Sequence, residues 1–118
     1  MNFTSSKIPI NAQASQNIVL TSPILIPDGA KNITCQFFFE LDAPSAEAAS
    51  VQAYQSTDGI NFDPVLNGAA NPLAVTLNPE NNSATINILG LLSLWLQFKI
   101  IFNDQSTGII TSCNMLFS

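Results

Sequence analysis

Hydrophobic and polar residues alternate along several short stretches of this chain. In the clearest stretch, from 31 to 41, every second residue is apolar; these residues are Ile33, Cys35, Phe37, Phe39 and Leu41. A period of two places successive side chains on opposite faces of a β-strand. The stretch therefore predicts a strand with one buried face.

A second run with this period extends from 92 to 102. Its apolar face would consist of Leu92, Leu94, Leu96, Phe98, Ile100 and Phe102. Helical spacing fits part of this run as well, which leaves the helix as an alternative to the strand. We adopt the strand because the whole run alternates.

Proline and glycine interrupt the chain roughly every 8 to 15 residues, and the runs between them predict further strands. These lie at 7–10, 17–21, 24–26, 51–56, 61–65, 73–77, 83–88 and 109–117. Short strands without intervening helices favour an all-β fold. We expect an antiparallel two-sheet β-sandwich, jelly-roll-like, with about eight to ten strands. Residues 7–118 would form this single domain and residues 1–6 a flexible N-terminal tail.

The composition excludes several classes of function. Of 118 residues, only 9% are charged, with three Lys, no Arg, no His and a net charge of −5. Nucleic-acid binding depends on Lys and Arg, and triad catalysis on His, so we expect neither. The five glycines stand far apart, which removes phosphate-binding loops. The sequence predicts no cofactor.

No part of the chain predicts a membrane span or a secretion signal. The most apolar segment, 86–102, is 17 residues long and is interrupted by polar side chains, whereas a membrane helix needs about 20 apolar residues. The N-terminus lacks a basic start followed by an apolar run. We expect no signal peptide and no membrane partner. Cys35 and Cys113 lie in alternating apolar runs, which favours buried thiols, although a disulfide between them stays open.

The most informative motif lies between two alternating stretches. Here Asp58-Gly59 predicts the turn of a β-hairpin, because glycine tolerates a positive φ. The pattern Ser56-x-Asp58-Gly59-x-Asn61-Phe62 resembles a hairpin of discoidin-like carbohydrate-binding modules and of small β-sandwich proteins in phage particles. The discoidin-like modules usually have Trp in place of Phe62.

The resemblance to phage proteins implies a non-enzymatic structural subunit of a virion. It would be a capsid decoration, head-fibre, tail-associated or minor capsid protein, assembled in the host cytoplasm. Its partners would be other virion or capsid proteins and further copies of itself. Phe38 and Ile101 are candidate contact residues, because each is apolar on the polar side of its predicted strand.

The resemblance to carbohydrate-binding modules implies an alternative, a module for host or cell-surface glycans. Its site would combine Tyr54 and Trp95 with the turn that carries Asp58, Asn61 and Asp63. The same three turn residues could offer oxygen ligands to calcium, but Asp and Asn are ordinary turn formers, so we assign no metal.

A small hydrolase is a third hypothesis, which would rest on the carboxylates of Glu40 and Asp42. Acidic residues at strand ends are usually solvated, so we expect no catalytic residue and no enzymatic activity.

Overall fold

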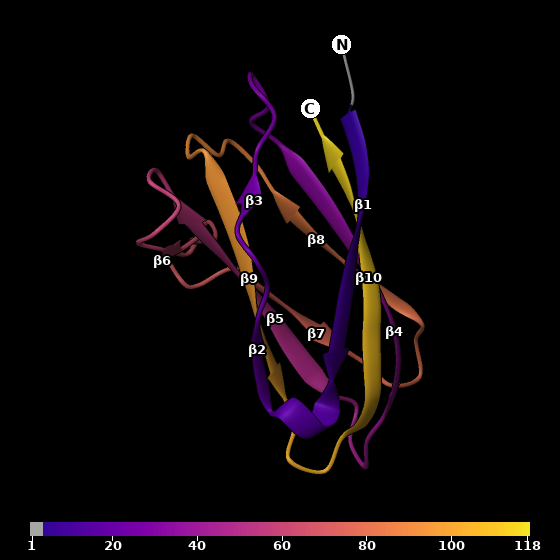
Figure 1. Cartoon of the computed structure of the whole chain (residues 1–118). Coiled ribbons are helices and arrows are strands. Elements are labelled where there is room, and N and C mark those ends of the chain that lie inside the picture. The colour runs from indigo at the N-terminus through magenta and orange to yellow at the C-terminus, as the bar shows by residue number, and fades with distance from the viewer. Residues whose placement is uncertain (1–3) are drawn as a thin grey trace.

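The computed structural model describes residues 4–118, and ten β-strands make up most of this part of the chain (Figure 1). A 3-10 turn, η1 (Ala14–Gln16), connects the first two. The strands are β1 (Thr4–Gln13), β2 (Ile18–Leu20), β3 (Ile24–Leu25), β4 (Ile33–Asp42), β5 (Ala49–Ser56), β6 (Asp63–Pro64), β7 (Ala74–Leu77), β8 (Ser83–Ile88), β9 (Trp95–Phe102) and β10 (Thr107–Phe117). Each stretch in which alternation predicts a strand overlaps one of them.

The strands form two antiparallel sheets. Sheet A has the order β1-β10-β4-β8, and sheet B has the order β2-β9-β5-β6. The short strands β3 and β7 also belong to sheet B, where β3 pairs with β9 and β7 with β5. If β2 and β3 are taken as one broken strand, and β6 and β7 as another, the order is that of an eight-stranded jelly roll. The predicted fold class is confirmed.

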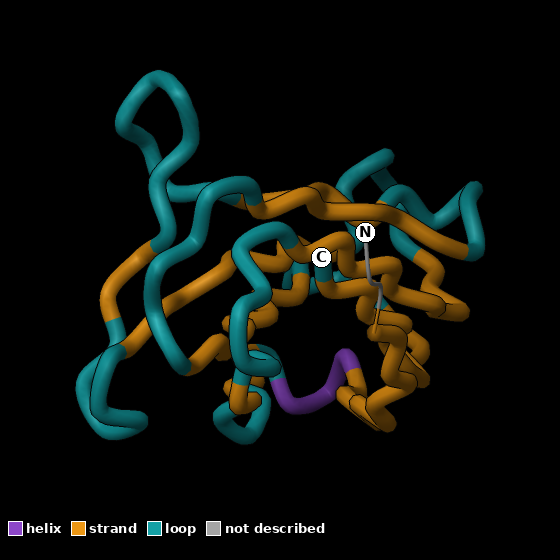
Figure 2. The backbone as a smooth tube through the Cα atoms, turned by 90° about the horizontal axis from the view of Figure 1, so that it is seen from above, coloured by secondary structure: helices purple, strands orange, loops and turns teal. Residues whose placement is uncertain are grey.

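The chain crosses from sheet A to sheet B through η1, which Figure 2 shows in purple between strands of the two layers. The backbone N–H of Gln13 donates to Oε1 of Gln16 at 2.8 Å, which closes this turn. At the other end of β1, Thr4 pairs with Phe117. Residues 4–6, which the sequence assigns to a flexible tail, therefore belong to strand β1. Residues 1–3 lie outside the described part.

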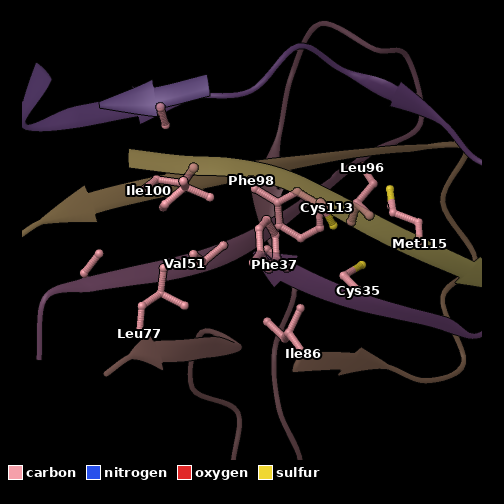
Figure 3. Close-up of a cluster of buried hydrophobic side chains, with 14 of the residues drawn as sticks. Cys35, Phe37, Val51, Leu77, Ile86, Leu96, Phe98, Ile100, Cys113 and Met115 are labelled. Carbon is pink, nitrogen blue, oxygen red and sulfur yellow. The ribbon is translucent and has the colours of Figure 1, made fainter. Parts of the chain in front are cut away.

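The core lies between the sheets and is filled by the alternating residues. The five apolar residues of the 31–41 stretch are all buried. Phe37 of sheet A meets Phe98 of sheet B edge to face, with ring centroids 5.0 Å apart (Figure 3). Such aromatic pairs contribute about 0.5–1.5 kcal/mol beyond the area that they bury. This contact joins the two layers near the middle of the cluster.

The expected strand at 92–102 is shorter than its alternation indicates. β9 begins at Trp95, and Leu92 and Leu94 are exposed instead of buried. The reason is the path of the chain, which must pass from β8 in sheet A to β9 in sheet B. In this loop Leu91 is the buried residue, and its N–H donates to the carbonyl oxygen of Lys31 at 2.7 Å.

Candidate interaction surface

The predicted hairpin is present, and its turn is held by one hydroxyl and one carboxylate. Strands β5 and β6 pair antiparallel on either side of it. The hydroxyl of Ser56 accepts from the N–H of Gly59 at 3.0 Å and donates to Oδ1 of Asp58 at 2.8 Å. Oδ1 of Asp58 also accepts from the N–H groups of Ile60 and Asn61, at 2.8 and 2.9 Å. The side-chain amide of Asn61 donates to Oδ2 of Asp58 at 2.9 Å.

These hydrogen bonds favour the ionised carboxylate of Asp58. The backbone N–H groups of Asn61 and Ile60 lower its pKa most, followed by the hydroxyl of Ser56, so the pKa lies well below its ordinary value. Both oxygens of this carboxylate are thus engaged within the turn. Asp63 lies beyond the turn, at the start of β6, and is exposed. The structure therefore brings together Asp58 and Asn61 and leaves Asp63 apart.

Trp95 packs against the same turn. It pairs with Ser56 in the β5–β9 register, and its indole covers Gly59. A Cβ atom at Gly59 would lie 3.0 Å from Cε2 of Trp95. Trp95 is consequently half-buried and acts in part as a cover for the turn.

Three of the candidate residues share the outer face of sheet B. Tyr54, Trp95 and Ile101 alternate with buried residues of β5 and β9, so they point away from the core. The hydroxyl of Tyr54 donates to Oε1 of Gln52 at 3.3 Å. Along the edge of this face, Ile18 lies opposite Ile101. All three candidates are half-buried by their neighbours.

Phe38 lies on the other side of the molecule. It alternates with the buried residues of β4 and therefore points out of sheet A, where Ser112 and Ser83 flank it. Most of this outer face carries hydroxyls and amides; for example, Thr34 donates to Oδ1 of Asn87 at 3.0 Å. Phe38 and Ile101 thus belong to opposite faces and cannot form one contact patch.

A surface that the sequence did not predict lies at the end of the sandwich where β9 begins. Leu25, Leu92 and Leu94 are exposed by 61, 83 and 56%. They line a surface hollow of about 450 Å³ between the 25–31 segment and the loop before β9. We call these three residues the leucine rim. The four leucines among residues 89–94 were its signal, because a strand could not bury leucines on both faces in a layer covered on one side.

Among residues 4–118, the remaining titratable groups do not gather into a site. Glu40 and Asp42 are both exposed on β4, where Glu40 lines an open surface hollow with Phe38, Phe39, Asn82 and Thr111. Within residues 4–118, no three Cys, Asp or Glu side chains lie close enough together to hold a metal ion. In the same range, the structure has no helix with the length and apolarity that a membrane span requires.

No protein-family model and no curated protein matches this chain. The fold, however, is similar to that of solved structures. One is the crystal structure of YomS, a protein derived from the SPBc2 prophage, with a TM-score of 0.63 and 9% sequence identity. The similarity covers 100% of this chain and 96% of YomS.

Two further structures have related folds. A protein of Bacillus endospore appendages, which form disulfide-linked pili, matches with a TM-score of 0.50 and 9% identity, over 98% of this chain and 88% of that one. Dimeric latent PorU from Porphyromonas gingivalis matches with a TM-score of 0.55 and 11% identity; the match covers 98% of this chain but only 12% of PorU. At such low identity these similarities establish the fold alone.

Proposed function

We propose that this protein is a non-enzymatic structural subunit of a bacteriophage particle, which associates with copies of itself and docks on other virion proteins. The observation that carries the proposal is the full-length similarity in fold to YomS, a prophage-derived protein. The appendage protein, which belongs to disulfide-linked pili, adds a second similar fold from a structural assembly. The virion is accordingly the proposed location.

The surface of the protein supports docking. Leu25, Leu92 and Leu94 form an exposed apolar rim on a protein in which only 9% of residues are charged, although Asp28 and Lys31 line the same hollow. Protein interfaces concentrate apolar anchors in a core that is depleted of charged residues, and a few such anchors carry most of the binding energy. The leucine rim is therefore the proposed contact with a larger virion protein.

Binding to virus particles tests this proposal. The purified protein is mixed with particles from the same source, intact or stripped of their outer proteins, and the pelleted fraction is measured. We expect retention on stripped particles, and we expect the double variant L92S/L94S to reduce it at least tenfold. The control is Leu66→Ser, because Leu66 is 55% exposed but lies outside the rim. Equal loss in both variants, or no retention of the wild type, contradicts the proposal.

Glycan binding is the alternative, and one observation favours it. Tyr54 and Trp95 project from neighbouring strands on the same face of sheet B, as aromatic platforms for sugars often do. The turn supports glycan binding less, because the carboxylate of Asp58 already accepts hydrogen bonds from groups within the turn. A glycan array with the wild type and Tyr54→Ala decides between the two functions. If the wild type binds a saccharide that Tyr54→Ala does not bind, and the wild type is not retained on particles, our ranking is reversed.

A further inference from the structure

Strand β8 forms one edge of sheet A, and its outward backbone groups can be identified. The N–H of Phe39 donates to the carbonyl oxygen of Asn82 at 3.0 Å, which makes these opposed residues a hydrogen-bonded pair. In an antiparallel ladder such pairs alternate with non-bonded ones. The N–H and C=O groups of Ser83, Thr85 and Asn87 therefore point away from β4.

The hydrogen bonds between β4 and β10 indicate independently which residues of β4 direct their backbone groups toward β8. Asn32 and Ser118 exchange two backbone hydrogen bonds, of 3.0 and 2.9 Å, at the end of the β4–β10 ladder. Even-numbered residues of β4 thus bond to β10 and odd-numbered ones to β8. Across residues 4–118, no backbone or side-chain atom accepts a hydrogen bond from the N–H groups of Ser83, Thr85 or Asn87. This edge is open for a further strand.

The other edges are protected against pairing. On β1, Lys7 and Pro9 lie along the edge, and the register shifts just after Pro9. Strands β2 and β3 have three and two residues and are separated at Pro23. Strands β6 and β7 have two and four residues, and Pro64 and Pro72 interrupt that edge. Charges, prolines, bulges and short strands are the usual means of blocking edge-to-edge association.

β8 has none of these features. It has six residues in continuous register with β4 and contains neither proline nor charge. Uncharged residues extend on both sides of it, from 81 to 98. An edge without charges is complementary to itself, because two copies related by a two-fold axis would place no like charges opposite each other.

We propose that two copies of this chain pair antiparallel through β8, with Thr85 opposite Thr85 of the second copy and Ser83 opposite Asn87. In this register each of the three residues donates and accepts one backbone hydrogen bond across the seam. The two A sheets become one continuous sheet, the β-augmentation used by many strand-pairing proteins. This inference rests on the self-association in the proposed function and assigns its surface.

Disulfide trapping tests the register. The two Thr85 residues would form a hydrogen-bonded pair, with Cα atoms about 5.5 Å apart, within the range that a disulfide spans. Thr85→Cys should therefore form a covalent dimer under mild oxidation. Ser83→Cys is the matched control, because four residues of strand, roughly 13 Å, separate it from the same residue of the second copy. Cys35 and Cys113 are buried and do not interfere.

The mass in solution tests the edge without a cross-link. By light scattering, the wild type should have twice the chain mass of 12.6 kDa at high micromolar concentration. Thr85→Lys places two like charges at the two-fold axis of the dimer. Thr85→Pro removes the outward backbone N–H of residue 85 without removing a hydrogen bond to β4. Each variant should weaken dimerisation at least tenfold. Thr76→Lys adds the same charge at an exposed position of β7 and should leave the dimer intact. Circular dichroism and melting curves establish that each variant is folded.

The outcomes separate this inference from the proposed function. Two results together support pairing through β8. Thr85→Cys is trapped as a covalent dimer whereas Ser83→Cys is not, and Thr85→Lys loses the dimer whereas Thr76→Lys keeps it. A wild-type dimer that the Thr85 variants neither trap nor weaken overturns it and leaves self-association in place. A monomer that still binds stripped particles also overturns it, while docking on the virion stands.

Discussion

The indole of Trp95 lies directly against the α-carbon of Gly59, across the join between β9 and the β5–β6 turn. Gly59 has a φ of +76°, and a Cβ atom there would come within 3.0 Å of Cε2 of Trp95. Glycine is thus required twice, once by the backbone and once by the indole. The turn and the start of β9 are therefore one structural unit.

Replacing this glycine should destabilise the protein. We expect Gly59→Ala to lower the free energy of unfolding by about 1–3 kcal/mol, since the left-handed backbone alone costs about 1–2 kcal/mol and the indole must also shift. Urea unfolding followed by circular dichroism measures the change, and tryptophan fluorescence reports on Trp95.

Gly68→Ala is the control for this substitution. Gly68 has no left-handed φ, and no atom lies within 4 Å of the position of its Cβ. Its replacement should change stability by no more than about 0.5 kcal/mol. Equal losses in the two variants would contradict both requirements at Gly59, the left-handed backbone and the cover by Trp95.

The carboxylate of Asp58 should make stability depend on pH. Its pKa is lowered in the folded state by the N–H groups of Asn61 and Ile60. The stabilisation is therefore complete above the unfolded pKa, about 3.9, and is lost as the pH falls toward the lower folded value. Asp58→Asn should melt below the wild type at pH 7, and the difference should shrink below pH ~4.

Asp104→Asn serves as the comparison at pH 7. Asp104 is also exposed in a turn, but no hydrogen bond to its side chain occurs among residues 4–118. Its melting temperature should stay close to that of the wild type. If the difference in melting temperature between Asp58→Asn and the wild type stays the same at low pH, the charge of Asp58 is not what stabilises the turn.

The two cysteines should be unreactive in the native protein. Cys35 on β4 and Cys113 on the neighbouring β10 are both free and fully buried. A hydrogen bond with Cys113 and burial raise the pKa of Cys35 far above its ordinary value, which disfavours the reactive thiolate. Ellman's reagent should modify neither thiol in native buffer and both in guanidinium. The exposed variant Thr76→Cys provides a rapidly reacting control, and comparable rates for the native thiols would contradict this arrangement.

Alternation in the sequence predicted the strands and their faces well, because burial on one side of a sheet selects every second residue. It could not predict which strands are neighbours, since a face does not identify a partner. The pairing of Ser56 with Trp95 illustrates this: the residues are far apart in the sequence, and only the β5–β9 register brings Trp95 onto the turn. The hairpin motif was therefore visible, whereas its cover was not.

The leucine rim was missed for a related reason. Leu92 and Leu94 continue the alternation of β9 without a break, so pattern alone assigns them to the core. Because the chain crosses from sheet A to sheet B before β9, this strand begins only at Trp95, and the crossing depends on the topology. The sequence likewise could not predict which backbone N–H and C=O groups of β8 point outward, because their direction depends on which residue pairs of β4 and β8 are hydrogen-bonded.

Adjacent phenylalanines on β4 provide a direct test of the register. Phe37 is fully buried against Phe98, whereas Phe38 is half-buried on the outer face. Phe37→Ala should cost about 3–5 kcal/mol, because it removes a large core side chain and leaves a cavity. Phe38→Ala should cost only ~1 kcal/mol. Urea titrations of both variants give the two values under one set of conditions. A shift of β4 by one residue would exchange the two side chains between the faces, so a larger loss in Phe38→Ala would place Phe38 in the core and overturn the register of sheet A.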